Sequence, residues 1–164
     1  MKRMFALCMI VLLAVAGCTY AKEQRRTAEE AEAMLDKAIA YYVSNDPKKA
    51  FAAFNDPKEE FVDGDLFIFA LDMNGTILAH GGKPALVGKG PDDIRDADEK
   101  NFITELMEAA KTKQSGTVDY KFETPASLMV EKKSSFFQEV GGIVLGSGYF
   151  TAYEWQVFPH PFSM

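Results

Sequence analysis

The stretch LFIFALDMNGTILAH, residues 66–80, decides the fold. It begins with six consecutive apolar residues and closes with a second short apolar run at residues 76–80. Between the two runs lies Asn74-Gly75, a strong hairpin signal, because a type I′ turn needs positive φ at both of its central residues. We therefore predict two antiparallel strands, residues 66–71 and 76–80, joined by a type I′ turn.

A long helix is predicted upstream of this hairpin. Thr27 has the character of an N-cap, and Glu30, three residues later, completes a capping box. Apolar residues then recur at helical spacing as far as Tyr42, while charged residues lie off that stripe. The pattern predicts one amphipathic helix that ends near Ser44-Asn45.

A second, short helix is predicted directly afterwards. Asp46 is suited to cap it, and Pro47 suits its first position, where the missing N–H costs nothing. The segment PKKAFAAF continues the helix, and Asn55-Asp56-Pro57 ends it.

Downstream of the hairpin, a loop-rich segment extends to Asp98, which is well placed to cap a helix that begins at Glu99. Three further strands follow this helix. The expected elements are a helix at 99–113 and strands at 116–122, 130–140 and 143–150. The order predicts an α+β domain in which a long N-terminal helix packs on a five-stranded antiparallel sheet.

The chain has the size and composition of one globular domain. It contains 164 residues, of which 48% are hydrophobic and 26% charged. Neither a repeat of solenoid period nor a long low-complexity run is present.

The N-terminus resembles an export signal. Lys2 and Arg3 precede an uncharged apolar run, residues 4–16, which is too short to span a bilayer as a mature helix. Val15-Ala16-Gly17-Cys18 then resembles a bacterial lipobox, with cleavage before Cys18 and lipidation of its thiol. The alternative is an ordinary secretory signal cut near Ala16. The expected organisation is a signal at 1–17, a tether at 18–26, a domain at 27–153 and a tail at 154–164.

Cleavage at this point settles the cysteine chemistry of the mature chain. Cys8 leaves with the signal and Cys18 is acylated, so thiol catalysis, disulfides and cysteine metal sites are excluded. Loss of Lys2 and Arg3 leaves 16 basic against 24 acidic residues, a formal charge of 16 − 24 = −8 in place of −6. An acidic exported domain is a poor candidate for binding nucleic acid.

The glycine-rich segment GGKPALVGKG, residues 81–90, is not a phosphate-binding loop. Five residues separate Gly82 from Gly88, where the P-loop has four, and Lys89 is followed by glycine. Pro84 interrupts the segment, and the preceding strand belongs to a hairpin. We expect a loop at the edge of a pocket.

The acidic run that follows also has two interpretations. Asp92, Asp93, Asp96 and Asp98 suggest calcium by their crowding, but the glycine and the terminal glutamate of an EF-hand are missing. A solvated loop is the better interpretation. No spacing around His80 indicates zinc, so we predict no metal or cofactor.

Four residues could converge over one face of the predicted sheet. His80 ends a strand, Tyr120 and Phe122 share a face of the next, and Lys133 lies in a strand rich in Ser and Phe. Histidine and lysine together would suit an anion such as a carboxylate. The alternative is structural, with Phe122 and His80 in the core and Lys133 in solvent.

Beyond these patterns, residues from about 28 to 150 resemble the single-Cache extracellular sensor domain of bacterial chemoreceptors and sensor kinases. The resemblance is carried, in chain order, by AFAAFNDP (50–57), FVDGDLFIF (61–69), DMNGTILAH (72–80), PALVGK (84–89), DAD (96–98), VDYKF (118–122), Lys133 with Ser135, and GSGY (146–149). It implies a long N-terminal helix on a curved antiparallel sheet of Per-Arnt-Sim (PAS) type.

The resemblance also implies a pocket on the sheet that binds small ligands, often short carboxylates. Its lining would be His80, Tyr120, Phe122 and Lys133, with Phe67 and Phe136 as walls. The family often has tryptophan at the position of Phe122 and tyrosine at those of Phe67, Phe136 and Phe150. Tyr149 could replace the hydroxyl absent from Phe150, although adjacent strand residues face opposite ways.

These observations lead to one expectation and two alternatives. We expect a bacterial periplasmic lipoprotein, held to the membrane through Cys18, whose Cache domain binds a small organic acid and signals through a receptor or kinase partner without catalysis. The resemblance further suggests a homodimer through the long helix. The alternatives are a degenerate Cache domain that serves as a structural or interaction module, and a hydrolase, for which no nucleophile or metal cluster is evident.

Overall fold

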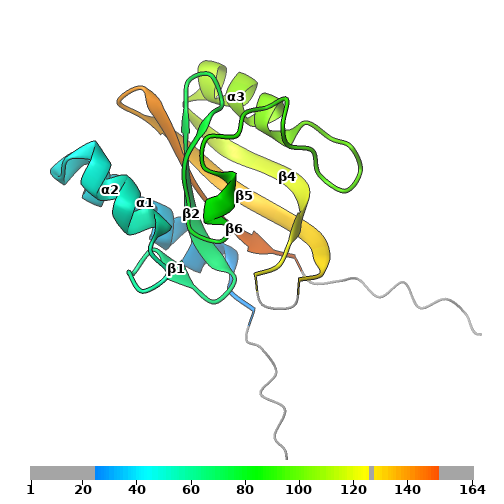
Figure 1. The fold of residues 1–164 in the computed structure, drawn as a ribbon, viewed down its shortest axis with the longest axis horizontal. Helices are drawn as coiled ribbons and strands as arrows, with labels where there is room; N and C mark the ends of the chain where they lie inside the picture. Colours follow the sequence, from blue (N-terminus) through cyan, green and yellow to red (C-terminus); the bar gives the residue numbers. More distant parts are fainter. Residues whose placement is uncertain (1–24, 126–127, 152–164) are drawn as a thin grey trace, which may run out of the picture.

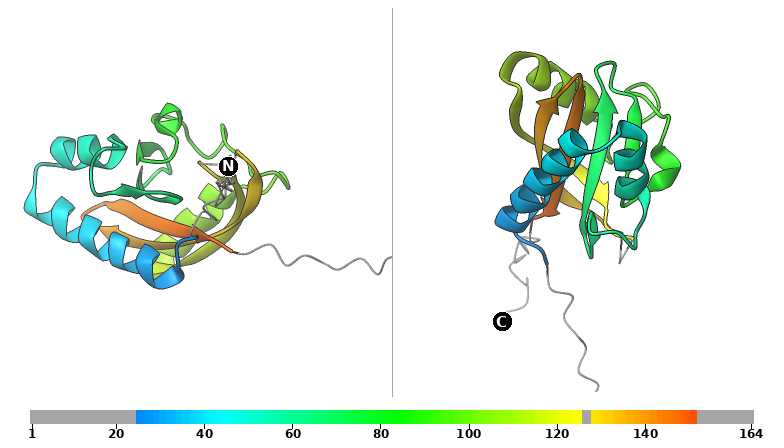
Figure 2. Two further views of the ribbon diagram at one scale, coloured as in Figure 1. Left: turned by 90° about the horizontal axis from the view of Figure 1, so that it is seen from below. Right: turned by 90° about the vertical axis from the view of Figure 1, so that its left-hand side faces the viewer.

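The computed structural model describes residues 25–125 and 128–151. This part of the chain forms helices on both faces of one curved sheet (Figures 1 and 2). The elements are α1 (Ala28–Ser44), α2 (Pro47–Asn55), β1 (Val62–Asp63), β2 (Leu66–Asp72), β3 (Ile77–His80), the 3-10 helix η1 (Pro84–Leu86), α3 (Phe102–Lys113), β4 (Ser115–Glu123), β5 (Val130–Val140) and β6 (Ile143–Phe150).

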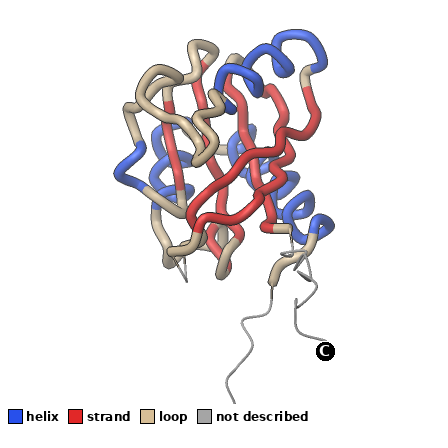
Figure 3. Tube along the Cα trace, turned by 90° about the vertical axis from the view of Figure 1, so that its right-hand side faces the viewer, coloured by secondary structure: helices blue, strands red, loops and turns tan. Residues whose placement is uncertain are grey.

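All strand pairs of the sheet are antiparallel. The order is β1-β2-β6-β5-β4, and β3 pairs with β2 on the same edge as the very short β1. Figure 3 shows the strands crossing the middle of the molecule, with helices above and behind them. The predicted α+β architecture is confirmed, and the five predicted strands are all present beside the two-residue β1.

Each face of the sheet carries its own apolar core, because successive side chains of a strand point to opposite faces. On one face, here called the α1 face, α1 and α2 pack on Ile68, Ala70 and Leu145. On the other, here called the α3 face, α3 packs on Phe69, Val118, Phe137 and neighbouring residues. The long helix and α3 thus lie on opposite sides of the sheet (Figure 2).

The predicted starts of α1 and α2 are confirmed. The Thr27 hydroxyl accepts from the Glu30 N–H, and the Glu30 carboxylate accepts from the Thr27 N–H, which completes the capping box. The Asp46 carboxylate accepts from the Lys48 N–H, and Pro47 opens α2.

The predicted start of α3 is wrong by three residues. Asn101 caps the helix by accepting from the Thr104 N–H, and Asp98 instead forms an ion pair of 2.7 Å with Lys121. The reason lies one residue further along. Glu99 has φ of 61°, in the left-handed region, and cannot belong to a right-handed helix.

The turn between β2 and β3 also differs from the prediction. Gly75 has φ of 85°, but Asn74 does not have positive φ, so the turn is not type I′. The Asp72 side chain explains the difference, because it accepts hydrogen bonds of 2.8 Å from the Asn74 N–H and 2.9 Å from the Thr76 N–H. These contacts fix a longer turn that needs only one glycine.

An irregularity in β3 determines which of its residues face α3. Ala79 pairs with Ala70 and Ile77 pairs with Leu71, so Leu78 is an extra residue and forms a bulge. In a regular strand Ile77 and His80, three residues apart, would face opposite ways. The bulge brings both side chains to the α3 face.

Candidate functional site

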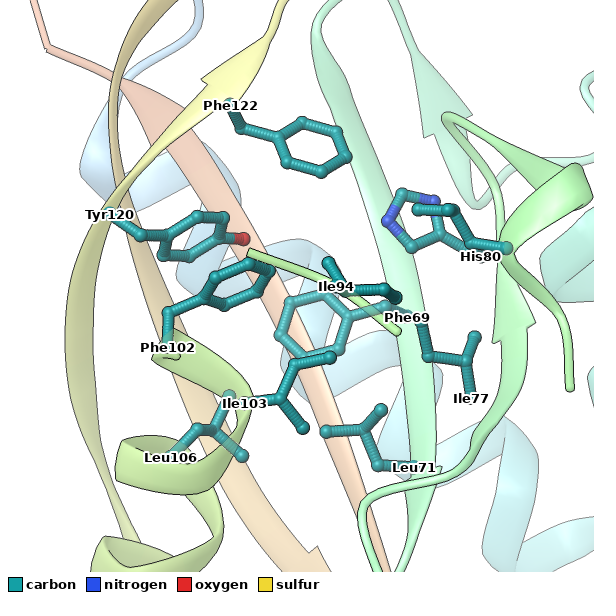
Figure 4. Close-up of a pocket in the computed structure, with 11 residues that line it drawn as sticks. Phe69, Leu71, Ile77, His80, Ile94, Phe102, Ile103, Leu106, Tyr120 and Phe122 are labelled. Atoms are coloured by element: carbon teal, nitrogen blue, oxygen red, sulfur yellow. The ribbon is translucent and has the colours of Figure 1, made fainter. Parts of the chain in front are cut away.

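A small pocket lies on the α3 face, between the sheet and α3 (Figure 4). Its volume is about 20 Å³, little more than one water molecule needs. The lining comes from the sheet, α3 and the two loops between them: Phe69, Leu71, Ile77, His80, Leu86, Ile94, Phe102, Ile103, Leu106, Tyr120 and Phe122. Only His80 and Tyr120 bring polar groups to a wall that is otherwise apolar.

His80 is fixed by two hydrogen bonds that arise from different elements. Its backbone N–H donates to Oδ1 of Asn55, the last residue of α2, at 2.8 Å. Its Nδ1 accepts from the backbone N–H of Lys83 at 2.9 Å. Burial, with smaller contributions from the charges of Lys133 and Lys83, lowers the His80 pKa to about 3. The imidazole is therefore neutral at physiological pH.

The bond from Lys83 also determines the tautomer of His80. In a neutral imidazole one nitrogen accepts and the other carries the proton. Because Nδ1 accepts, the proton lies on Nε2. The ring extends toward Phe122 and Tyr120 across the pocket (Figure 4), so Nε2–H is a donor on the pocket side.

Tyr120 is the second polar group of the lining. Its ring lies parallel to Phe102, with 4.1 Å between the ring centroids and 3° between the planes. The hydroxyl lies 3.0 Å from the Ser135 hydroxyl, on the neighbouring strand. Burial raises the Tyr120 pKa above its usual value, so the phenol stays protonated and either hydroxyl can donate to the other.

Phe67 and Phe122 complete an aromatic cluster around His80. The Phe67 ring centroid lies 4.8 Å and the Phe122 centroid 5.5 Å from that of His80. Phe122 also meets Tyr120 edge to face, with their centroids 6.0 Å apart. Four of the predicted site residues are therefore gathered in one place.

Lys133 lies beside this cluster, with its ammonium group against the Phe67 ring. It pairs across the strands with Tyr120 and faces the same side of the sheet. Its Nζ lies 4.1 Å from the Phe67 ring centroid and 4.2 Å from that of Phe150, and donates to the Gly148 carbonyl at 2.7 Å. Only 1% of the residue is exposed. Burial lowers the Lys133 pKa to about 7, against the opposing effect of the Asp65 charge.

Phe136 and Tyr149 were expected in this pocket, and the structure places them elsewhere. Phe136 pairs with Ser147 and Thr117, and Tyr149 pairs with Ser134, all on the α1 face. The two rings stack on each other with 6.1 Å between their centroids. Strand alternation makes Phe136 face away from Phe137, and Tyr149 away from Phe150, so neither lines the pocket between the sheet and α3.

The structure adds Asn55 and Lys83 to the site. From the sequence, Asn55 was no more than the end of a short helix, and Lys83 was one residue of a loop at the edge of a pocket. Lys83 holds His80 through its backbone and forms an ion pair of 2.9 Å with Glu123 across the loop edge. Spacing offers no signal for Asn55, because it lies 25 residues from His80. Lys83 is only three residues from His80, but it donates through a backbone N–H, which carries no side-chain signal.

Two kinds of feature are absent from residues 25–125 and 128–151. No three His, Cys, Asp or Glu side chains come together there in a way that could hold a metal ion. None of the helices described has both the length and the apolar character needed to span a bilayer.

The sequence profile of one protein family, described as "Single Cache domain 2", matches residues 28–156. No curated protein matches the chain significantly.

Several solved structures share the fold. One is a methyl-accepting chemotaxis protein from Vibrio parahaemolyticus, with a TM-score of 0.64 and 21% identity over 74% of this chain and 86% of that one. Another is the periplasmic sensor domain of a chemotaxis protein, with a TM-score of 0.58 and 22% identity over 76% and 90% of the two chains. A third is a Cache chemosensory domain studied for carboxylic acid recognition, with a TM-score of 0.59 and 21% identity over 76% and 88%.

Proposed function

The chain belongs to the single Cache domain 2 family, and on that basis we propose that it is an extracytoplasmic sensor domain that binds a small organic acid or a related metabolite. The ligand would occupy the pocket between the sheet and α3. The observation that carries this proposal is the His80 Nε2–H donor, held in a fixed orientation inside an aromatic and aliphatic wall.

The chemistry of the site fits a short acid with an apolar end. His80 and the Tyr120 hydroxyl would hydrogen-bond one end of the ligand, and the α3 side chains would cover the other. Lys133 is close enough for its charge to lower the His80 pKa, so it would also stabilise an anion placed beside His80. The likeness to a domain that recognises carboxylic acids supports this choice.

Entry of a ligand requires side chains to move, because the cavity volume is only about 20 Å³. Phe122 and Leu86 are the partly exposed members of the lining, whereas the central residues His80, Tyr120 and Phe69 are buried. We place the entrance at these two residues. A ligand of few heavy atoms is favoured, since a larger one would also have to displace α3.

No catalytic step is part of the proposal. The lining contains one histidine and one tyrosine, and no acid, serine or cysteine lies among its eleven residues. The site therefore offers orientation and hydrogen bonding without a nucleophile–base pair.

The protein would be attached to a membrane surface and would signal through a partner protein. The apolar run at 4–16 and the lipobox at Cys18 support export and attachment to a membrane surface. Both lie outside the described residues, as does the tail at 154–164. The bound state would pass to a receptor or kinase partner, and the long α1 is the candidate surface for a homodimer.

A second candidate function follows from the small cavity. A degenerate Cache domain would keep the fold as a structural or interaction module and bind no ligand. The phenylalanines at 67, 122 and 150 favour it, because they carry none of the polar groups of the tyrosine or tryptophan that the family often has there. A ligand test separates the two candidates.

The test is a thermal-shift screen of the mature protein against short mono- and dicarboxylates and amino acids. A ligand at one hundred times its Kd should stabilise the protein by about 2.7 kcal/mol. Tyr120→Phe should weaken the response, whereas Tyr149→Phe, on the other face of the sheet, should leave it unchanged. If no compound stabilises the protein, or if both variants respond like the parent, the sensor proposal fails.

A further inference from the structure

Three consecutive apolar residues are exposed where β5 begins. The exposed fractions of Leu128, Met129 and Val130 are 69%, 58% and 46%. The other large hydrophobic residues exposed in the described part of the chain, Val43 and Val87, stand singly. A contiguous apolar patch on a small acidic domain marks a surface that contacts something apolar. We call these three residues the hairpin tip.

The hairpin tip lies at the end of the molecule where the N-terminal segment enters the fold. Arg25, the first described residue, donates to Glu131 at 2.8 Å, and Glu131 directly follows Val130. Figure 1 shows the β4–β5 hairpin and the start of α1 at the same lower end. The chain from Cys18 therefore arrives beside the tip.

The length of that segment limits how far the tip can lie from an anchor at Cys18. Seven peptide steps separate Cys18 from Arg25, and an extended chain of that length reaches about 25 Å. A membrane anchor at Cys18 would thus keep this end of the domain within one domain diameter of the lipid surface.

Acidic charge at this end of the molecule is partly neutralised by ion pairs. Three acidic side chains at this end have basic partners. The pairs are Arg25 with Glu131, Arg26 with Asp63, and Lys83 with Glu123. The chain as a whole has a formal charge of −6, so these pairs reduce the repulsion that anionic headgroups would exert on this end.

From the exposed tip, the entering chain and the paired charges, we propose that the hairpin tip docks into the lipid surface to which the protein is anchored. Leu128 and Met129 would enter the headgroup region, with α1 and the pocket held at a defined orientation above it. This inference rests on the lipid anchor of the proposed function, and not on the ligand.

The test uses the mature lipidated protein in vesicles of phosphatidylethanolamine and phosphatidylglycerol. Leu128→Cys and Val43→Cys are compared, each labelled with an environment-sensitive fluorophore. Both parent residues are apolar and 69% exposed, and Val43 lies near the opposite end of α1. Because the mature chain has no cysteine besides Cys18, each variant presents one thiol.

Docking predicts a blue shift and a several-fold rise in emission at position 128 and no change at position 43. Equal emission at both positions in vesicle-bound protein would overturn the docking while leaving the anchor intact. A blue shift at 128 that persists in detergent, together with a doubled mass, would assign the tip to a second protein copy and also overturn it. Protein that does not float with the vesicles would remove the anchor and the docking together, but a carboxylate response would still support the sensor.

Discussion

The Nδ1 atom of His80 accepts a hydrogen bond of 2.9 Å from the backbone N–H of Lys83. This contact ties the end of β3 to the loop that follows it. Because Nδ1 accepts, the single N–H proton of the neutral His80 ring lies on Nε2, on the pocket side. Protonation of His80 would place a second proton on Nδ1 and break the contact. The loop and the pocket are therefore both sensitive to the charge of one ring.

The first prediction concerns stability in acid. Burial lowers the His80 pKa to about 3 in the folded protein, against 6.5 for the ordinary value. Between these values the unfolded chain binds more protons than the folded one, so stability falls as pH falls, by about 1.4 kcal/mol per pH unit. Urea denaturation of the parent and His80→Gln across this range measures it. If the unfolding free energy of the variant falls with pH as steeply as that of the parent, His80 is not the buried neutral group.

The second prediction concerns stability in base. The folded pKa of Lys133 is about 7, and the ordinary value is 10.5. The unfolded chain again binds more protons between these values, so the Lys133 contribution to stability rises with pH up to about 10.5 and is lost as pH falls toward 7. Lys133→Met keeps a side chain of similar length between the Phe67 and Phe150 rings. It should flatten the rise of unfolding free energy with pH.

The matched control for that variant is Lys132→Met. Lys132 is the neighbouring residue and is exposed on the other face of the sheet. Its replacement should shift the free energy of unfolding by no more than about 0.5 kcal/mol at any pH. If the pH dependence of the unfolding free energy flattens in both variants, or in neither, the rise in stability does not come from Lys133.

The third prediction concerns the ligand itself. An anion beside His80 would favour the charged form of Lys133 and raise its pKa, so binding would take up a proton at pH above about 7. Affinity for a carboxylate should therefore fall as pH rises from about 7 toward 9. Calorimetry in buffers of different ionisation enthalpy measures both quantities. Binding without proton uptake, and equally tight at both pH values, would place the ligand beyond the reach of Lys133.

Much of this architecture was accessible from local sequence signals. Capping residues gave the starts of α1 and α2, because Thr27 and Asp46 each bond to a backbone N–H two or three residues away. The hairpin at 66–80 was also predicted, but its turn type was not, because the Asp72 side chain overrides the preference of Asn74-Gly75. Local rules succeeded where the partner atoms are close in sequence.

The candidate site depends more on contacts between segments that are distant in sequence. The gathering of Phe67, His80, Tyr120 and Phe122 was predicted by a family resemblance rather than by spacing alone. Strand alternation could have excluded Phe136, because it is three residues from Lys133 on one strand and so faces the other way. The bulge at Leu78 and the Asn55 contact were out of reach, since each depends on pairing between separate segments.

The fourth prediction tests the support of His80 by α2. Asn55→Ala removes the acceptor of the buried His80 backbone N–H and should cost about 1–3 kcal/mol of unfolding free energy. Asn45→Ala is the control, because Asn45 also bonds to one backbone group, the Tyr41 carbonyl, but within the end of α1 rather than between two elements. Denaturant titration of both variants should show the larger loss for Asn55. An equal loss would mean that the His80 N–H finds water when Asn55 is removed.

The last prediction uses a glycine that the pocket wall requires. A Cβ at Gly146 would overlap the ring of Phe69, its cross-strand neighbour and a lining residue of the pocket. Gly146→Ala should therefore cost about 1–3 kcal/mol, because the buried ring must shift in a packed core. The ring can yield only toward α3, so the variant should also lose much of any stabilisation by a ligand. Gly90→Ala, whose nearest atom would be Asp93 Oδ2 at 3.9 Å, should change neither quantity. A Gly146→Ala protein with reduced stability but an unchanged ligand response would separate Phe69 from the binding site and move the ligand toward Phe122 and the loop.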